Sequence, residues 1–257
     1  MKITFYGSCQ LEAVSKIFKE YCDCEIQVIV NWSYMLKEIP LPECIYDSDV
    51  FIYQVYNSND KYKEYSTDTI INKMDKNKVK LISMPFISFR GYWPDAFLDI
   101  RNNNTKTNKR PYGMFPQQSS ILSNQLPLND EHYTPEYIEK YIENFFNTIE
   151  ANESKCDIKV CNFIKENYKK KILFYSIQHP CNDVLLHVYH QIVDILKLHE
   201  TFSFPKEMLY DHTVLILPCV QKVLGIHQTQ YKLFGSGVVS QEEYVDLYNK
   251  YICDPEL

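Results

Sequence analysis

The sequence predicts an α/β fold in which crossover helices connect a mainly parallel sheet. Helical patterns separate the first apolar run from the second, and the third from the fourth. Strands that alternate with helices pair in parallel, because the chain must cross back before the next strand begins. The runs themselves are short and apolar, as buried strands are, and they occupy residues 3–6, 25–30, 49–55 and 79–84.

The first predicted strand, residues 3–6, ends at a glycine and leads into a helical pattern. Residues 25–30 alternate into a second strand, and acidic turn residues precede the third, at 49–55. A short helix at 67–74 and a fourth strand at 79–84 complete this half. The apolar face of the first helix is formed by residues at helical spacing, namely Leu11, Val14, Phe18 and Tyr21.

The second half of the chain is richer in helical patterns. Residues 101–110 are polar and turn-forming, which indicates a surface loop. Thr134 precedes Pro135, an arrangement typical of a helix start, and a second helix is predicted for 154–169. We expect one α/β domain, residues 1–257, with a helical insertion at about 100–170. Its later elements are a strand at 172–176, a helix at 182–198, a strand or buried segment at 213–217, and a helix at 241–251.

Composition excludes several classes of protein. The chain has 257 residues and a net charge of −6, so it is not a general nucleic-acid binder. Apolar residues make up 45%, which is too many for a disordered chain. We expect no membrane-spanning segment and no signal peptide, because no long apolar stretch occurs. The nine cysteines form no pair of CxxC motifs, so we expect reduced thiols, no metal and a cytoplasmic location.

The first candidate site is the segment Gly7-Ser8-Cys9-Gln10, which follows the first predicted strand. Ligands of open parallel sheets bind beyond the carboxyl ends of the strands. A cysteine at the start of a helix is expected to favour its thiolate form, because the helix dipole stabilises negative charge there. The adjacent N–H groups would suit an oxyanion. The alternative is an ordinary turn that carries an inert thiol.

The second candidate is His179, which follows the predicted strand at 172–176. Pro180 next to it is expected to begin a helix, so that the histidine projects from a rigid turn. Histidine is the usual general base near neutral pH. His179 is therefore the predicted base of the site.

The third candidate is the loop after the fourth strand, residues 86–95. Its arginine, Arg90, is one of three in the chain, and Arg101 and Arg110 follow closely. Arginine makes bidentate contacts with phosphate, so this clustering in an acidic protein indicates an anionic ligand. The alternative is a solvated loop. Gln54, at the end of the third strand, adds an amide that can donate or accept a hydrogen bond.

In their order and spacing, these segments resemble the WcbI-type family of polysaccharide biosynthesis enzymes. Most members of that family have Asn where Ser8 stands. A more distant similarity to SGNH hydrolases concerns the thiol after the first strand and the late histidine. The segments that carry the family resemblance are Gly7-Ser8-Cys9-Gln10, Met84-Pro85 leading to Phe89-Arg90-Gly91-Tyr92-Trp93-Pro94-Asp95, Leu173-Phe174-Tyr175 leading to His179-Pro180, and Leu217-Pro218-Cys219-Val220 leading to Leu224-Gly225.

The resemblance implies an acyltransferase, with acetyl as the expected acyl group, that binds coenzyme A. The implied donor is acyl-CoA (acetyl-CoA), and the implied acceptor is a glycan or nucleotide sugar of capsular or surface polysaccharide synthesis. It also implies an SGNH- or Rossmann-like core. The expected catalytic residues are Cys9, Gln10, Asp95 and His179. The expected residues for binding CoA are Gly7, Ser8, Gln54, Arg90, Tyr92, Trp93 and Arg110, with the two aromatic rings stacking on adenine or sugar.

Two mechanisms and two other functions remain open at the sequence level. Cys9 either carries the acyl group covalently or supplies, with Gln10, main-chain donors for an oxyanion while His179 activates the acceptor directly. Asp95 either orients His179 or binds the acceptor. The other functions are an SGNH-like esterase that acts on acylated glycans without CoA, and a non-catalytic protein that binds a glycan or nucleotide.

Overall fold

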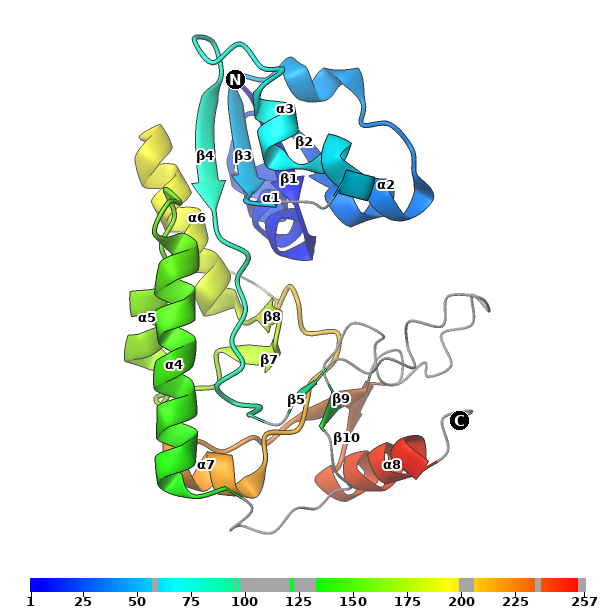
Figure 1. The fold of residues 1–257 in the computed structure, drawn as a ribbon, viewed down its shortest axis with the longest axis vertical. Helices are drawn as coiled ribbons and strands as arrows, with labels where there is room; N and C mark the ends of the chain where they lie inside the picture. Colours follow the sequence, from blue (N-terminus) through cyan, green and yellow to red (C-terminus); the bar gives the residue numbers. More distant parts are fainter. Residues whose placement is uncertain are drawn as a thin grey trace. The chain divides into compact units, whose positions relative to one another are not determined.

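The computed structural model (Figure 1) describes residues 1–56, 60–94, 96–97, 121–122, 133–198, 206–233 and 237–253. These residues form two compact units. Unit 1 comprises Met1–Ile87, Glu150–Phe163 and Asn182–Leu209, and unit 2 comprises Ser88–Ile149, Ile164–Cys181 and Tyr210–Leu257. Within the described ranges, the helices are all too short or too polar to cross a lipid bilayer.

Unit 1 contains a four-stranded parallel sheet with the strand order β2-β1-β3-β4. The register places Gly7 beside Val30 and Tyr6 beside Tyr53, so the strands end near one another at the carboxyl edge. This sheet confirms the predicted α/β class and the four predicted strands. Their bounds are β1 Lys2–Gly7, β2 Glu25–Val30, β3 Val50–Gln54 and β4 Lys80–Met84.

Helix α1 (Cys9–Tyr21) packs on one face of this sheet, and α6 (Asn182–Leu196) packs against α1. Alternate residues of β1 face opposite sides, as a strand requires. Phe5 therefore contacts Phe18 of α1, with ring centroids 5.3 Å apart, and Phe18 contacts Tyr189 of α6 at 4.9 Å. The predicted apolar face of the first helix is thus buried, which fixes the position of its amino terminus.

The other face of the sheet is covered by short elements. Tyr6 and Phe51 stack there within an apolar cluster, and the Tyr6 hydroxyl donates to the Tyr65 carbonyl at 2.6 Å. Burial of both faces accounts for the apolar strand sequences. The covering elements are α2 (Asn31–Lys37), α3 (Thr67–Ile71) and the 3-10 helices η1 (Glu43–Tyr46) and η2 (Asp60–Tyr65).

Unit 2 has an aromatic core centred on Phe89. This ring lies 4.9 Å from Tyr92 and 5.5 Å from Phe174, with Phe145 and Tyr168 close by. The described residues of this unit also form three two-stranded pairings. Its elements are β5 (Ala96–Phe97), β6 (Ile121–Leu122), β7 (Phe174–Ser176), β8 (His179–Pro180), β9 (Tyr231–Leu233), β10 (Gly237–Val239), α7 (Pro218–Leu224), α8 (Gln241–Cys253) and parts of α4 (Pro135–Glu153) and α5 (Cys161–Asn167).

Two predictions near residue 180 differ from the structure, and one further prediction is confirmed in one of its two forms. The strand at 172–176 shortens to β7, which pairs antiparallel with β8 rather than joining the parallel sheet. Pro180 belongs to β8, and helix α6 begins two residues later, so Pro180 does not begin a helix. Residues 213–217 are buried without forming a strand, which matches the second of the two predicted alternatives. Helices α4 and α8 lie where the sequence predicts them.

Candidate functional site

Cys9 is the first residue of α1 and lies two residues beyond the end of β1. The Ser8 hydroxyl caps the helix by accepting a hydrogen bond from the Gln10 N–H at 3.3 Å. Gly7 makes the turn possible, since a Cβ there would lie 2.7 Å from Gln54 Oε1 and 2.9 Å from Leu11 Cδ1. The Cys9 thiol is half-buried, so the turn does not seal it in the core.

Two buried glutamines hold this turn in place. Gln10 Nε2 donates to the Ile87 carbonyl at 2.6 Å, and Gln10 Oε1 accepts from the Ile87 N–H at 3.1 Å. Gln54 Nε2 donates to Gln10 Oε1 at 2.7 Å, while Gln54 Oε1 accepts from the Ser8 N–H at 2.6 Å. The network joins the segments that follow β1, β3 and β4 through neutral amides.

The amide network gives both glutamines a clear structural role. Gln10 has no exposed surface and Gln54 is 3% exposed, and both ends of each amide are bonded within unit 1. Buried polar groups are satisfied in this way because an unmade hydrogen bond is costly. The Gln10 N–H donates to the Ser8 hydroxyl, and the role of the Cys9 and Gln10 N–H groups as donors to an oxyanion stays a prediction. Direct contact of either glutamine with substrate stays a prediction.

The two aromatic residues predicted to stack on a ligand are core residues. Tyr92 and Trp93 have no exposed surface. The Tyr92 hydroxyl donates to the Tyr168 carbonyl at 2.8 Å, and the Trp93 indole N–H donates to the Leu215 carbonyl at 3.1 Å. Burial raises the pKa of Tyr92, so its hydroxyl remains neutral. Neither ring has a face available for stacking on a ligand, because both rings are fully buried in unit 2. The polar atom of each ring is hydrogen-bonded to the main chain.

Arg90 is half-buried in the same unit. One Nη nitrogen donates to the Ala96 carbonyl, which uses part of the guanidinium for the turn. The buried Nε has no hydrogen-bond partner within the described part of the chain. Arg90 therefore keeps unused donor capacity. Asp95, Arg101 and Arg110 lie outside the described residues.

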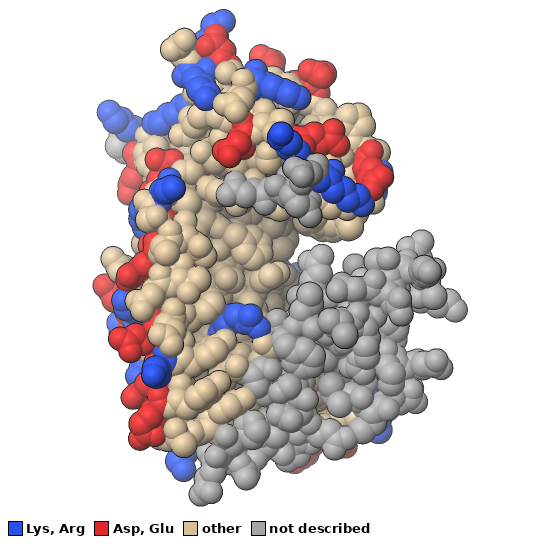
Figure 2. Space-filling view, in the orientation of Figure 1, with Lys and Arg blue, Asp and Glu red and all other residues tan. Residues whose placement is uncertain are grey.

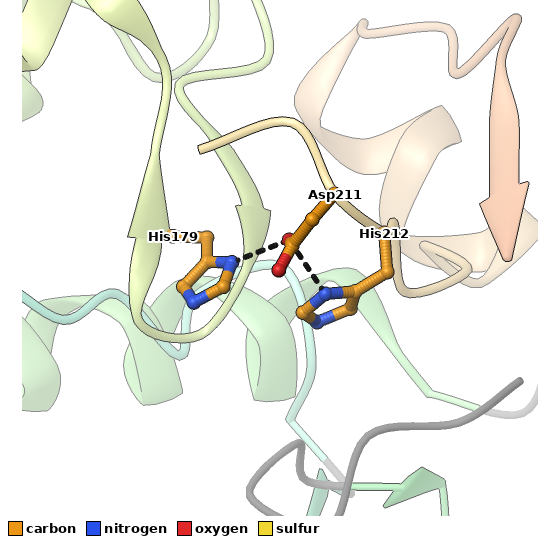
Figure 3. Close-up of side chains that lie close together, drawn as sticks. All are labelled: His179, Asp211 and His212. Atoms are coloured by element: carbon orange, nitrogen blue, oxygen red, sulfur yellow. Dashed lines mark hydrogen bonds and ion pairs between the residues drawn. The ribbon is translucent and has the colours of Figure 1, made fainter. Parts of the chain in front are cut away.

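His179, Asp211 and His212 form a compact cluster in unit 2 (Figure 3). His179 Nδ1 lies 2.9 Å from Asp211 Oδ1, and His212 Nδ1 lies 2.8 Å from the same oxygen. The His179 ring comes from β8, whereas the other two residues come from the segment before the buried stretch at 213–217. His212 is nearly buried, while the Asp211 carboxylate is 44% exposed.

The ionisation of Asp211 sets the tautomers of both histidines. Burial raises the pKa of the Asp211 carboxyl, but the hydrogen bonds from His179 and His212 outweigh this effect, so the pKa lies well below its usual range. Burial lowers the pKa of His212 and keeps that ring neutral. An ionised carboxylate only accepts hydrogen bonds, so each ring carries a proton on Nδ1. Nε2 is then the basic nitrogen of His179 when this ring is neutral.

The same three residues are a possible metal-binding group. Their ligand atoms lie within 4.8 Å of one another, and two imidazoles with a carboxylate suit Zn²⁺. The hydrogen bonds to a single carboxylate oxygen explain the cluster without an ion. Lys232, whose charge helps to lower the pKa of His212, donates a hydrogen bond to the Tyr210 carbonyl.

Sequence reasoning identifies His179 but misses Asp211 and His212. These two residues follow His179 by more than thirty positions and stand in no recognisable motif. A carboxylate that orients a histidine needs only spatial proximity, which sequence spacing does not encode. The expected juxtaposition of Cys9 with His179 stays a prediction, because the two residues belong to different units.

The fold and these residues define a class: an α/β protein with a cysteine at the carboxyl edge of a parallel sheet and a carboxylate-bound histidine. The model of the family described as "Polysaccharide biosynthesis enzyme WcbI" matches residues 2–201. The chain belongs to this family. Among curated proteins, none matches the chain.

A solved structure of a WcbI protein supports the fold. It has a TM-score of 0.65 and 17% identity with this chain, and the match covers 99% of this chain and 91% of the other. That protein is described as a novel polysaccharide biosynthesis enzyme, in a native form without a disulfide bond between CoA and one of its cysteines. The similarity confirms the expected fold class.

Proposed function

We propose that this enzyme transfers an acyl group, with acetyl as the expected group, from acyl-CoA to a sugar hydroxyl of a surface-polysaccharide precursor. The hydrogen bond between His179 and Asp211, at 2.9 Å, is the observation that carries the proposal. It assigns the Nδ1 proton and makes Nε2 the basic nitrogen, as acyl transfer to a hydroxyl requires. The family supports a role in polysaccharide synthesis, and the CoA named for the related structure supports the donor.

In the direct route, His179 Nε2 takes the proton of the sugar hydroxyl as its oxygen attacks the thioester carbonyl. The main-chain N–H groups of Cys9 and Gln10, at the start of α1, stabilise the resulting oxyanion. The carbon–sulfur bond then breaks, and the imidazolium returns its proton to the departing CoA thiolate. Asp211 stabilises the transient imidazolium and keeps its ring oriented.

In the covalent route, His179 takes the proton of the Cys9 thiol, the thiolate attacks the thioester, and the imidazolium gives this proton to the departing CoA thiolate. The acyl group is then bound to the Cys9 sulfur as a new thioester. The sugar hydroxyl, deprotonated by His179, attacks that thioester and releases the thiolate. Both routes require the Cys9 turn and the His179 imidazole to act on the same acyl group.

The phosphates of CoA are assigned to arginine residues of the chain. Arg90 Nε is a donor with no partner in the described ranges, and we propose that it contacts a phosphate of CoA. Arg110 is proposed for the same task. Gly7 and Ser8 shape the turn that presents the thiol. We further propose that the enzyme acts in the cytoplasm, where its many thiols remain reduced.

The test combines acetyl-CoA with a panel of sugars and nucleotide sugars. Release of CoA is followed with a thiol reagent, and acetylated sugar is identified by mass spectrometry. We expect CoA release that depends on the acceptor. Release of CoA without an acetylated product, or cleavage of a nitrophenyl ester by an enzyme that ignores CoA, would contradict transfer and favour an esterase.

Cys9→Ser separates the two routes. The covalent route predicts almost no turnover, whereas the direct route predicts a modest reduction because the main-chain donors remain. Mass spectrometry after mixing with acetyl-CoA alone provides an independent readout. An acetyl group on the Cys9 peptide supports the covalent route, and its absence together with turnover in Cys9→Ser supports the direct route.

A further inference from the structure

Asp211 accepts hydrogen bonds from two histidines, although a single carboxylate bond is enough to fix the tautomer of one base. His179 Nδ1 lies 2.9 Å from Asp211 Oδ1, and His212 Nδ1 lies 2.8 Å from the same oxygen. Figure 3 shows the two rings on either side of this carboxylate, each with Nδ1 directed at it. The role of His179 as a base does not by itself account for the second ring.

The contacts of Asp211 differ from the ion pairs on the surface of unit 1. Figure 2 shows basic and acidic side chains intermingled over the part of the molecule that holds the four-stranded sheet. Lys61 and Glu38, for example, lie 3.1 Å apart with side chains that are 63% and 66% exposed. Water screens such pairs, so they contribute little to stability. The His212 side chain is only 6% exposed, so its bond to Asp211 is better shielded from water.

Exposure also shows which of the three side chains has room to turn. The Asp211 side chain is 44% exposed and that of His179 is 18% exposed, whereas His212 is nearly buried. The last torsion of an aspartate is broad, so an exposed carboxylate turns unless several bonds fix it. A bond to His179 alone would let the carboxylate and that ring turn together. His212 supplies a second bond from a side chain that packing holds in place.

Hydrogen bonds tie the segment that carries His212 to two strands of unit 2. The Thr213 N–H donates to the Lys232 carbonyl of β9 at 2.8 Å, and the Lys232 N–H donates to the Thr213 hydroxyl at 2.8 Å. The Val214 N–H donates to the Tyr175 carbonyl of β7 at 2.8 Å. Because β7 pairs with β8, these bonds also connect the segment to the strand of the other histidine.

The His212 ring donates to Asp211 as a neutral group. Burial lowers the pKa of His212 and outweighs the bond to Asp211, which raises it. A neutral donor fixes the carboxylate and leaves its negative charge for the imidazolium that forms on His179 during turnover. A cationic side chain in place of His212 would hold Asp211 too, but its charge would oppose that imidazolium.

We propose that His212 is a positioning residue, which fixes the Asp211 carboxylate in the orientation that accepts the Nδ1–H bond of His179. The proposal rests on the proposed function, since the orientation of His179 affects turnover only where this ring is the base. A displacement of about 1 Å at a reacting group costs about a hundredfold in rate. Loss of the second bond should therefore lower kcat. KM for acyl-CoA should not change, because a nearly buried ring does not contact the donor.

Ring spectra of the full-length native chain test the arrangement without an acyl donor. Nitrogen-15 spectra distinguish the tautomers of the seven histidines, and single substitutions assign the signals. We expect His179 and His212 both to carry a proton on Nδ1, because an ionised carboxylate only accepts hydrogen bonds. A His212 ring protonated on Nε2 alone could not donate to Asp211 and would overturn the proposal, whatever the variants show.

Two substitutions of His212 separate the hydrogen bond from the packing of the ring. His212→Phe keeps a planar ring and removes the donor, so we expect kcat to fall about tenfold while KM for acyl-CoA is unchanged. The His179 ring should then exchange between its two tautomers. His212→Asn places an amide donor near the position of Nδ1, so it should keep the native His179 tautomer and a kcat within about threefold of the native value.

Tyr244→Phe is the matched control for general loss of stability. It removes a buried hydrogen bond to the same segment, from the Tyr244 hydroxyl to the Thr213 carbonyl at 3.2 Å, and leaves the bonds to Asp211 in place. We expect a lower midpoint in urea unfolding with an unchanged kcat and an unchanged His179 tautomer.

Three results with these variants would each overturn the proposal. The first is a native kcat in His212→Phe, which would show that the second bond has no effect on turnover. The second is an equal loss in His212→Phe and His212→Asn, which would show that the ring rather than the donor is needed. The third is an equal loss in Tyr244→Phe, which general destabilisation would explain.

Failure of the proposed function gives a different pattern. A chain without transferase activity, in which His212→Phe disturbs the His179 tautomer and His212→Asn does not, retains the positioning role and loses the transferase. A transferase that His179→Ala inactivates and His212→Phe leaves fully active retains the proposed function and loses the positioning role.

Discussion

The Cys9 turn in unit 1 and the His179 cluster in unit 2 are built in opposite ways. Neutral amides and main-chain groups hold the turn, with Gln10 and Gln54 fully bonded and almost completely buried. An ionised carboxylate that accepts from two imidazoles holds the cluster. The turn consequently has a geometry that pH barely affects, whereas the cluster depends on the protonation of its members.

This difference indicates a division of tasks in the proposed reaction. A thiol or an oxyanion donor needs a fixed place, which buried amides provide without adding charge. A base needs a defined tautomer and a nearby counter-charge for the imidazolium, which Asp211 provides. Changes to the cluster should therefore affect turnover, and changes to the turn should affect stability first.

The largest expected effect is that of His179→Ala on turnover. Loss of the base should lower kcat about a hundredfold or more, because the acceptor hydroxyl then has no group to remove its proton. Steady-state CoA release with a saturating acceptor measures the change. His190→Ala is the control, since His190 is an exposed histidine on α6. A loss of less than tenfold would remove His179 from its assigned role.

Asp211→Asn should have the next largest effect, lowering kcat about tenfold to a hundredfold with little change in KM for acyl-CoA. The amide can donate to Nδ1 and so place the ring proton on Nε2, which is the wrong tautomer for a base. Nitrogen-15 spectra of the histidine rings report the tautomer directly. An unchanged His179 tautomer together with an unchanged kcat would show that the hydrogen bond is only structural.

Gly7→Ala tests the amide-built turn through stability. The new Cβ would approach Gln54 Oε1 and Leu11, and the bonded glutamine has little freedom to move, so we expect a loss of about 1–3 kcal/mol. Gly225→Ala is the comparison, because its φ is +66° but no atom lies within 4 Å of the new Cβ. Its cost of about 1 kcal/mol comes from the backbone alone. Equal losses in urea unfolding would contradict the close packing at Gly7.

The smallest expected effect is a difference in the pH dependence of stability. The pKa of folded His212 is lowered by burial, so the unfolded chain binds more protons once the pH falls below about 6.5. Stability should therefore decline from pH 7 towards pH 5. His212→Asn keeps a hydrogen-bond donor for Asp211 but removes this decline. Unfolding free energies of both chains across this range measure the effect, and parallel curves would contradict it.

Asp211 also contributes to stability at lower pH. Its pKa in the folded chain lies below the value of an unfolded aspartate, so its contribution is present above about pH 4 and is lost as the pH falls further. The two groups thus affect stability in separate pH windows. The Cys9 turn, which is held by amides, should add nothing to either window.

The sequence predicts the parallel sheet of unit 1 well, because its apolar strands and amphipathic helix are local patterns. Phe18 and Leu11 show their burial in their spacing alone. The β7–β8 pairing is missed, since three strand residues beside a turn fit a parallel strand or a hairpin equally well. From the sequence, Tyr92 and Trp93 are predicted as ligand contacts, but both are buried. In a loop, the spacing of aromatic residues does not distinguish a core position from a surface one.

The candidate site shows the same limit of sequence reasoning. Cys9 and His179 follow strand ends, so topology alone singles them out. Asp211 lies beside His179 only in the folded chain, since the two residues are 32 positions apart in sequence. Strand order and spatial proximity depend on tertiary packing, which short motifs do not record.

Calorimetric titration of the full chain with CoA, acetyl-CoA and ATP tests the central claim, use of a CoA thioester as donor, most directly. We predict saturable binding of CoA and acetyl-CoA and much weaker binding of ATP, which lacks the pantetheine arm. At about 100 times the dissociation constant, CoA should also raise the unfolding free energy by about 2.7 kcal/mol. No measurable heat and no stabilisation with either CoA compound, or equal binding of ATP, would contradict the account.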